Sequence, residues 1–382
     1  MKITIIGWYG TETIGDRAIL AGLLSFFSMS FKSFEIKLGS LYSFFTERTI
    51  NEDYAFYKEI IKKDIKIDIF NSKKSKELVK AIKESNLVVM GGGPLMDLDE
   101  LFMVEYTFKK AKKLGIKTAL LGCGVGPLFH KKYKKSVLKI VLNSDLVILR
   151  DAKSKENLEE IFNDFSIFFD TKLIYTSYDP AVECALEFNK IYKKNEEDYI
   201  AINLREFPHG YSKNENLKKE IDDGLKYFVG DLSDKFSKKE ILLIPMHYFH
   251  IGGDDRIFLN RIALELNKKN IYVQNPNLTL KETMQLYSNA YFNIGMRFHA
   301  VVLQTLVNGN NYILDYTEPN KGKIFGFIND IDKVGFYKNR YLSLQKDKIK
   351  SEIIKYENTK FEFDIDEIKK KLEIYIVKLK EV

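Results

Sequence analysis

An arginine and a histidine lie two residues apart in the segment Gly295–Ala300. The apolar run Ala290–Ile294 before them is typical of a buried strand, and a helix-like segment follows. Arg297 and His299 therefore come where a parallel strand turns into a helix, and there the helix amides and the positive end of the helix dipole favour a bound anion. A fixed cation beside a titratable acid/base suits a reaction that holds an anionic substrate while a proton moves. The alternative is an arginine that pairs with a surface carboxylate and a histidine that caps the helix.

Arginine is rare in this chain, which has eight arginines against fifty-two lysines. Arg150, Arg205 and Arg297 each follow an apolar, strand-like run, and none of them lies in a lysine cluster. These three are therefore the candidate anion ligands, whereas most lysines are expected to be solvated. For Arg150, an ion pair with Asp151 that shapes the loop is an equally good interpretation. No alternation of basic and aromatic residues suggests a nucleic-acid groove, so no nucleic-acid partner is expected.

Three glycine-rich segments follow strand-like runs in the first half of the chain, and the first two contain candidate site residues. The first, 7–16, contains Gly10, Thr13 and Asp16 and opens a helix, where Asp16 can cap the helix or orient a substrate hydroxyl. The second contains Gly92 and Gly93, whose backbone we expect to press against a ligand rather than a helix. Neither of these two segments has the spacing of a dinucleotide fingerprint or of a Walker-type phosphate loop. The chain is therefore not expected to be a nucleoside triphosphatase.

Other polar residues near the predicted strand ends have weaker patterns. His247 and His250 have a spacing that permits a metal, but no third ligand is obvious, so no metal site is predicted. Asp97 and Asp99 are interpreted as an exposed loop pair. Lys321 follows the last predicted strand and can return over the strand ends as an anion ligand.

The elements that must position these residues alternate along the chain between short strands and amphipathic helices, as in a parallel sheet with helices on both faces. The pattern restarts after the polar stretch Lys190–Asp198, so the 382 residues are predicted to form two domains, 1–190 and 191–344, with a helical charged tail over 345–382. Two such domains would face each other across a cleft lined by strand ends. The predicted strands are 2–7, 34–39, 65–70, 87–91, 117–122 and 145–149, then 199–204, 241–245, 271–274, 290–294 and 311–314.

Composition restricts the setting in which the protein works. No apolar run approaches the ~20 residues that span a bilayer, and the N-terminus does not read as a signal peptide. Two cysteines, Cys123 and Cys184, suit a reducing cytoplasm. The segment 131–142 begins with four lysines among five residues and predicts a basic amphipathic helix. Such a helix either lies against anionic lipid, which would give a peripheral membrane contact, or presents a solvated face.

Taken in order, six segments make this chain resemble the polysaccharide pyruvyltransferase family. Each segment is weak alone, and their order and spacing between residues 3 and 326 make the resemblance specific. They are Gly7–Leu20, Val88–Asp97, Gly115–Leu128, Leu149–Leu158, Ile202–Arg205 with Ile244-Pro245, and Ile294–Ala300 with the later Tyr316 to Lys321.

The resemblance implies two Rossmann-like domains arranged as in B-type glycosyltransferases, an N-terminal acceptor side and a C-terminal donor side. It also implies phosphoenolpyruvate as co-substrate, no further cofactor, and a sugar or lipid-linked oligosaccharide acceptor that receives a pyruvyl ketal. By motif, Arg205 and Arg297 would hold the donor's phosphate and carboxylate, with Lys321 and Arg150 as further cations. His299 would be the acid/base.

The chain departs from the family pattern at two positions. Thr13 replaces a usual asparagine, and His247 replaces a common glutamine. Both are expected to line the acceptor side of the cleft together with Gly10, Asp16, Gly92 and Gly93. The competing hypotheses are a B-type glycosyltransferase that uses a nucleotide-sugar donor and a non-catalytic glycan binder on the same fold.

Overall fold

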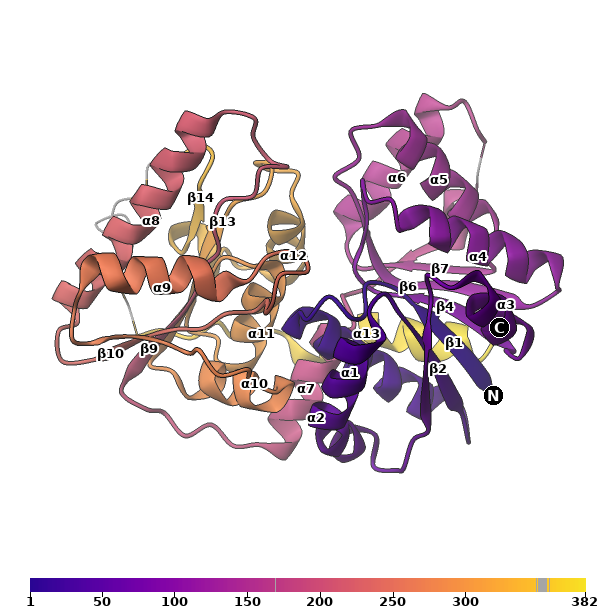
Figure 1. Cartoon of the computed structure of the whole chain (residues 1–382), viewed down its shortest axis with the longest axis horizontal. Coiled ribbons are helices and arrows are strands. Elements are labelled where there is room, and N and C mark those ends of the chain that lie inside the picture. The colour runs from indigo at the N-terminus through magenta and orange to yellow at the C-terminus, as the bar shows by residue number, and fades with distance from the viewer. Residues whose placement is uncertain (169, 348, 350–355, 357) are drawn as a thin grey trace. The chain divides into compact units, whose positions relative to one another are not determined.

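The computed structural model describes residues 1–168, 170–347, 349, 356 and 358–382. The chain divides into two compact units (Figure 1). The first unit comprises residues 1–12, 16–187 and 364–382, and the second comprises 13–15 and 188–363. Each unit is built on a parallel sheet, which confirms the predicted class of two α/β domains.

The sheet of the first unit is flanked by helices on both faces. Its strands follow the order β3 (Ile67–Asn71), β2 (Glu35–Ser40), β1 (Lys2–Ile6), β4 (Leu87–Gly91), β6 (Lys117–Val125), β7 (Leu146–Leu149) and β8 (Ile174–Thr176), and the short β5 (Pro94–Leu95) pairs with the end of β6. One face carries a row of neighbouring helices, α3 (Ser75–Lys83), α4 (Leu101–Lys113), α5 (Lys131–Leu142) and α6 (Ala152–Asp164). The apolar sides of these helices and the strands beneath them form one continuous hydrophobic core. The strands are apolar along their length because helices cover both faces of the sheet.

The other helices of the first unit are α1 (Ile14–Ser30), α2 (Ser43–Ile61), α7 (Ala181–Ile191) and α13 (Ile365–Leu379). The C-terminal helix α13 packs on α1, where the rings of Phe26 and Tyr375 stack with centroids 4.3 Å apart. The Tyr375 hydroxyl also donates a hydrogen bond to the Tyr178 carbonyl at 2.6 Å. The end of the chain is thereby attached to the unit in which the chain begins.

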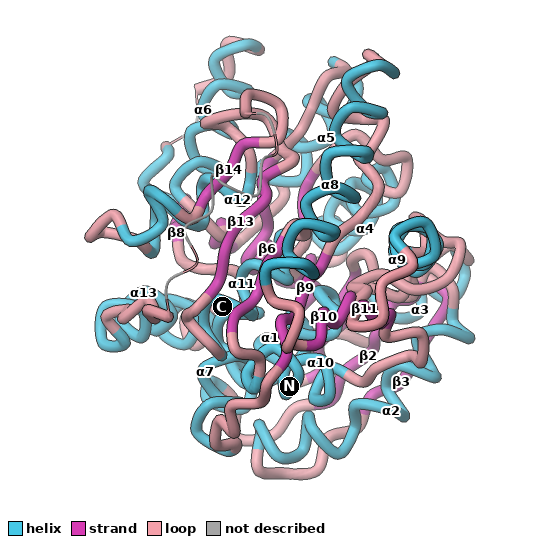
Figure 2. The backbone as a smooth tube through the Cα atoms, turned by 90° about the vertical axis from the view of Figure 1, so that its left-hand side faces the viewer, coloured by secondary structure: helices cyan, strands magenta, loops and turns pink. Residues whose placement is uncertain are grey.

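The second unit contains a six-stranded parallel sheet (Figure 2). Its strand order is β11 (Ile271–Val273), β10 (Glu240–Leu243), β9 (Tyr199–Asn203), β12 (Phe292–Gly295), β13 (Asn311–Asp315) and β14 (Tyr341–Ser343). Its helices are α8 (Glu215–Lys235), α9 (Asp255–Leu266), α10 (Leu280–Asn289), α11 (Phe298–Val307) and α12 (Lys323–Ile331). The strand order reverses between β9 and β12, and ligands of open α/β sheets bind beyond the carboxyl ends of the strands at such a reversal.

Several elements differ from the sequence-based expectation. The strands β8 and β14 and the long helix α2 were not predicted, because their apolar residues are few or irregularly spaced. The helical tail was predicted to start at residue 345, and this start is wrong. The described residues between 345 and 363 are not helical, and α13 begins at Ile365. Part of that predicted tail, at 348, 350–355 and 357, lies outside the described residues. Among the described residues, every helix is too short or too polar to cross a membrane.

The contact between α1 and the start of α7 yields a stability prediction. In an isolated helix, Gly22→Ala would stabilise by about 1 kcal/mol. Here an added Cβ would lie 1.9 Å from the Pro180 carbonyl oxygen, so α1 and α7 would have to separate. Overpacking of this kind costs about 1–3 kcal/mol, so we expect a lower free energy of unfolding in chemical denaturation.

Gly210→Ala is the matched control for this substitution, because a Cβ at Gly210 would meet no heavy atom within 4 Å. We expect the control to unfold at the wild-type denaturant concentration. A Gly22→Ala protein that is as stable as the wild type would contradict the inferred packing.

Candidate functional site

The parallel register of β9 and β12 brings two of the predicted arginines together. Asn203, the last residue of β9, pairs with Gly295, the last residue of β12. Arg205 and Arg297 each come two residues later, so both lie at the carboxyl edge of the sheet, where the strand order reverses. The Asn203 side chain tightens the arrangement, because its oxygen accepts the Arg297 backbone N–H at 3.0 Å. The two candidate donor ligands therefore share one site.

Arg297 is held by a carboxylate that the sequence analysis did not assign to it. Its Nε and Nη2 donate to the two oxygens of Asp255 at 2.7 and 2.5 Å, a bidentate pair. Asp255 is buried, and its Oδ2 also accepts the backbone N–H groups of Met246 and His247, both at 3.1 Å. Burial works against the charge of Arg297, but the Asp255 carboxylate outweighs it, so the pKa of the guanidinium is raised. Arg297 is a permanent, rigidly oriented cation.

Arg205 lies in a more strongly positive environment. Burial and the nearby charge of Arg297 both lower the pKa of its guanidinium. Its Cζ is 5.5 Å from the ring centroid of Tyr316, the first residue after β13. Among the described residues Arg205 forms no salt bridge, which distinguishes it from Arg297. The group that would best relieve this environment is an anion.

The pKa of Tyr316 is shifted by the same excess of positive charge. Its side chain is buried, and burial alone would raise the pKa of the phenol. The charges of Lys323, Arg205 and Arg297 outweigh burial and lower the pKa instead. A phenol whose anionic form is favoured lies where a phosphate or carboxylate would be stabilised in the same way.

The lysine of this cluster is Lys323 rather than the predicted Lys321. The Nζ of Lys323, the first residue of α12, lies 5.9 Å from the ring centroids of Phe298 and Tyr316. The Lys321 ammonium is largely exposed and lies 3.7 Å from Glu318. The Glu318 carbonyl accepts the N–H groups of Lys321 and Gly322 in a turn. Lys321 lies within this turn, whereas Lys323 lies after it.

His299 is the second residue of α11 and lies against the start of α1. A Cβ built on Gly15 would fall 2.0 Å from its Nδ1, so this close approach requires glycine. Thr13 hydrogen-bonds the Gly15 N–H through its hydroxyl at 3.1 Å and thereby caps the start of α1. The segment Thr13–Gly15 belongs to the second unit, where Thr13 forms a bridge with His247. The two atypical positions of the sequence analysis are therefore neighbours.

His247 is nearly buried, and the following loop folds over its ring. A Cβ at Gly252 would lie 2.6 Å from His247 Cε1, and the His247 carbonyl accepts the Asp255 N–H at 3.0 Å. His250 is exposed. Within the described ranges, no three His, Cys, Asp or Glu side chains are grouped so that they could hold a metal ion.

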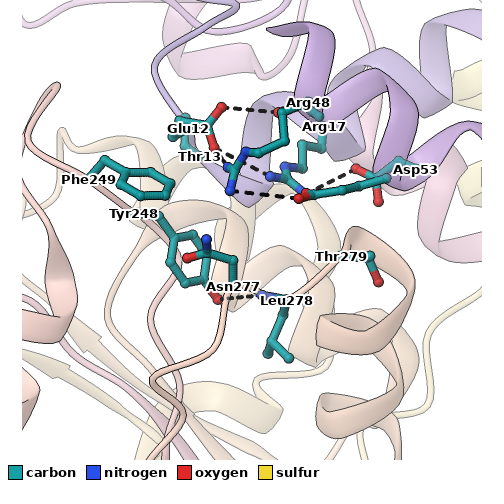
Figure 3. Close-up of polar contacts among 12 residues, drawn as sticks. Glu12, Thr13, Arg17, Arg48, Asp53, Tyr248, Phe249, Asn277, Leu278 and Thr279 are labelled. Atoms are coloured by element: carbon teal, nitrogen blue, oxygen red, sulfur yellow. Dashed lines mark hydrogen bonds and ion pairs between the residues drawn. The ribbon is translucent and has the colours of Figure 1, made fainter. Parts of the chain in front are cut away.

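In the first unit, a network of buried charges fixes the loop after β1 (Figure 3). Glu12 has a left-handed backbone with φ 60°, and its carboxylate pairs with Arg48 and accepts the Thr49 hydroxyl at 3.1 Å. Arg17 lies 3.5 Å from the same carboxylate and also pairs with Asp53 at 3.3 Å. This network sets the backbone immediately before Thr13.

The loop also carries Gly10 and Asp16 of the predicted acceptor set. Gly10 has φ 92°, and a Cβ there would meet the Ser40 hydroxyl at 2.8 Å, so the tight turn explains this glycine. Asp16 accepts the Thr11 hydroxyl at 3.1 Å in the first turn of α1. Both residues are positioned by their own loop, and their contact with an acceptor stays a prediction.

The glycines after β4 are explained by packing. A Cβ at Gly92 would meet the Ile19 side chain of α1 at 2.4 Å, and one at Gly93 would meet the Trp8 ring at 2.4 Å. The side-chain space at both positions is therefore filled by protein, whereas we had expected a ligand there.

Arg150 is the predicted cation that belongs to the first unit. It is buried, its Nε is 3.2 Å from Asp151, and its Nη1 is 3.9 Å from Asp179. Asp151 in turn accepts the Ser154 N–H at 2.5 Å as the N-cap of α6. The ion-pair interpretation accounts for Arg150 in full.

Three residues of the site were not recognised as such in the sequence: Asp255, Tyr316 and Lys323. Asp255 is one of two adjacent acidic residues, and nothing in the sequence pairs it with Arg297. A register argument could have found Tyr316, because it follows β13 as Arg297 follows β12. Residue type alone cannot show which of Lys321 and Lys323 belongs to the site, because both are lysines.

The comparison with known families gives one match, to the model described as polysaccharide pyruvyl transferase. It covers residues 14–317, which include Arg205, Arg297, His299 and Tyr316 but end before Lys323. A search of curated proteins found no match.

Solved structures resemble this chain in fold. A UDP-GlcNAc 2-epimerase from Methanocaldococcus jannaschii in complex with UDP-GlcNAc and UDP is 16% identical with a TM-score of 0.50, covering 90% of this chain and 97% of its own. MnaA of S. aureus with UDP is 12% identical with a TM-score of 0.55, covering 92% and 85%. At these identities the likeness establishes the B-type glycosyltransferase fold, which confirms the predicted fold class.

The cations around Tyr316 predict a pH-dependent contribution to stability. The pKa of this phenol is lowered in the folded protein and is about 10 when unfolded, so the unfolded state binds more protons between the two values. The stabilisation therefore grows as the pH rises through this window and is lost as the pH falls below the folded pKa. We expect the stability of the wild type relative to Tyr316→Phe to increase over the same window in denaturant titrations.

An alkaline titration followed by phenolate absorbance checks the same group directly. One tyrosine should titrate below the others in the wild type, and Tyr316→Phe should lack that transition. Tyr337→Phe is the control, because Tyr337 is also buried but burial raises its pKa. If both variants keep the early transition, Tyr316 is not the group responsible.

Proposed function

The chain belongs to the polysaccharide pyruvyl transferase family, and on that premise we propose that it moves the pyruvyl group of phosphoenolpyruvate onto a sugar as a ketal. The acceptor is a cell-surface polysaccharide or its lipid-linked precursor, and phosphate is released. The observation that carries the proposal is that Arg205, Arg297 and Lys323 surround Tyr316 beyond the carboxyl ends of β9, β12 and β13, where His299 is the second residue of α11.

The charge of the site suits this donor. Phosphoenolpyruvate carries a phosphate and a carboxylate close together, and each requires a cation or several N–H donors. Asp255 occupies Nε and Nη2 of Arg297, so the Nη1 edge of this guanidinium is the one that a carboxylate or phosphate would meet. Arg205, after β9, and Lys323, at the start of α12, add two further positive charges. Tyr316 lies between them as a positioning residue that keeps both cations near the donor.

His299 is the proposed acid/base. In the first half of the reaction the oxygen of one sugar hydroxyl bonds to C2 of the donor, its proton leaves, and the methylene carbon gains a proton and becomes a methyl group. In the second half the C2–O bond to phosphate breaks, a second hydroxyl oxygen bonds to C2, and the departing phosphate takes up the second proton. An imidazole can carry the first proton from hydroxyl to carbon.

The proposal requires no resident cofactor, because fixed cations can neutralise the charge that develops on the departing phosphate. Thr13 and His247, together with Gly10 and Asp16, are proposed to contribute to acceptor recognition. We also propose a cytoplasmic location, since both thiols, Cys123 and Cys184, are buried and unpaired with each other, as suits a reducing compartment.

Thermal unfolding with added ligands tests the proposal first. Phosphoenolpyruvate at about one hundred times its dissociation constant should stabilise the protein by about 2.7 kcal/mol, and UDP-sugars should leave it unchanged. His299→Ala should keep this stabilisation but lose about 10²–10⁴-fold in phosphate release with a competent acceptor, the usual contribution of an acid/base.

The other outcomes separate the competing hypotheses. Stabilisation by a nucleotide sugar alone would identify a glycosyltransferase. Stabilisation by glycans, with no phosphate release in any acceptor screen, would identify a binder. Full turnover by His299→Ala would remove the acid/base role of this residue.

Lys323 and Lys321 form a matched pair for testing the donor site. Lys323→Ala removes a cation beside Tyr316 and should raise KM for phosphoenolpyruvate by roughly 10- to 100-fold, the loss of one charged hydrogen bond. Lys321→Ala removes an exposed ammonium of the same type and should leave KM near the wild-type value. The reverse result would restore Lys321 as the donor ligand.

A further inference from the structure

Large apolar side chains are exposed on the first unit at the N-terminal ends of α4 and α5. Phe129, in the loop before α5, is 65% exposed, and Leu98 and Phe102 are each 38% exposed. We call this surface, together with Lys131, Lys132 and Lys135, the α4–α5 face. A group of exposed aromatic and aliphatic side chains is unusual on a free surface and marks a site of interaction.

The face is contiguous and firmly held. The ring of Phe102 stacks on Tyr133 with centroids 5.3 Å apart, and Lys132 Nζ lies 4.4 Å from the Tyr133 centroid. Asp97 connects the two loops, because its Oδ2 accepts the backbone N–H groups of Phe129 and His130, both at 3.1 Å. The exposed Phe129 is thus presented by a fixed backbone.

The α5 side of the face is basic. Residues 126–142 contain five lysines and no acidic residue. Lys132, Lys134 and Lys139 form ion pairs with carboxylates of neighbouring elements. Lys131 and Lys135 are exposed and form no salt bridge within the part of the chain that the structure describes. The segment before α4 carries Asp97, Asp99 and Glu100, so the positive charge of the face comes from the lysines at the start of α5.

From these observations we propose that the α4–α5 face docks on an anionic lipid bilayer. Lysines attract the negative surface potential, and exposed aromatic and aliphatic side chains enter the interface, which is the combination that interfacial helices use. The loops that carry Leu98 and Phe129 follow β5 and β6, and β5 pairs with the end of β6, so the face lies at the carboxyl edge of the first sheet. A lipid-linked acceptor would have its sugar near this edge. That consequence depends on the proposed function, whereas the docking itself does not.

Flotation of the full-length protein with vesicles tests the docking without any substrate. We expect binding to phosphatidylcholine vesicles that contain phosphatidylglycerol, little binding to phosphatidylcholine alone, and release at high salt. The variant Phe129→Ser with Lys131→Glu and Lys135→Glu should bind at least tenfold more weakly, because each lysine near an anionic surface contributes roughly fivefold.

The matched control makes the same changes in the second unit: Leu264→Ser with Lys238→Glu and Lys269→Glu. Leu264 is 79% exposed and both lysines are exposed, so charge and hydrophobicity change equally. The control should float as the wild type does. Equal loss in both variants, or no flotation of the wild type, would overturn the proposal.

Sedimentation of the same proteins tests the alternative that a second copy of this chain binds the face. A dimer that the Phe129 variant dissociates, with no vesicle binding by the wild type, would make the face a contact between copies of this chain and would overturn the docking. Vesicle binding by a protein that fails to respond to phosphoenolpyruvate would refute the proposed function and leave the docking standing.

Discussion

The carboxylate of Asp255 accepts four hydrogen bonds and joins the exits of two strands. Two come from the backbone after β10, at Met246 and His247, and two come from the guanidinium of Arg297 after β12. A buried carboxylate without such partners would carry a desolvation cost of several kcal/mol, so Asp255, Arg297 and the 246–247 turn must form together. The direction of Arg297 and the backbone facing Thr13 are therefore fixed by one interaction.

Although Asp255 pairs with Arg297, the cluster of Arg205, Arg297 and Lys323 keeps an excess of positive charge around Tyr316. The lowered pKa values of Arg205 and Tyr316 are two consequences of that excess, one on a cation and one on an acid. Like charges brought together in a partly buried site destabilise the empty protein. An anionic ligand removes this cost on binding, so part of the affinity for an anion is built into the free site. Stability is often sacrificed in this way where a protein acts.

The sequence was sufficient for the parts of the site that depend on strand ends. Arg205, Arg297 and His299 follow apolar runs whose ends are visible, and parallel strands end at one edge. It was insufficient where loop conformation decides. Lys321 and Lys323 differ only in which side of a hydrogen-bonded turn they occupy, and Gly92 and Gly93 look alike whether a ligand or Ile19 and Trp8 fill the space beside them. For Arg150 the sequence offered Asp151 as an ion-pair partner, whereas the second carboxylate, Asp179, lies 29 residues further along the chain and could not be paired from sequence.

The fold alone does not choose among the anions that such an edge can bind, since solved structures of the same fold contain UDP or UDP-GlcNAc. The distribution of charge does narrow the choice. A diphosphate bound at a single helix N-terminus can be held largely by backbone N–H groups. Here cationic side chains instead follow β9 and β12 and begin α12, which places positive charge on more than one side of the same point. A compact ligand with two separate anionic groups satisfies that geometry better than an extended one. In the proposed function, His299 acts on the donor that these cations hold, because it follows Arg297, the N-cap residue of α11, by two positions.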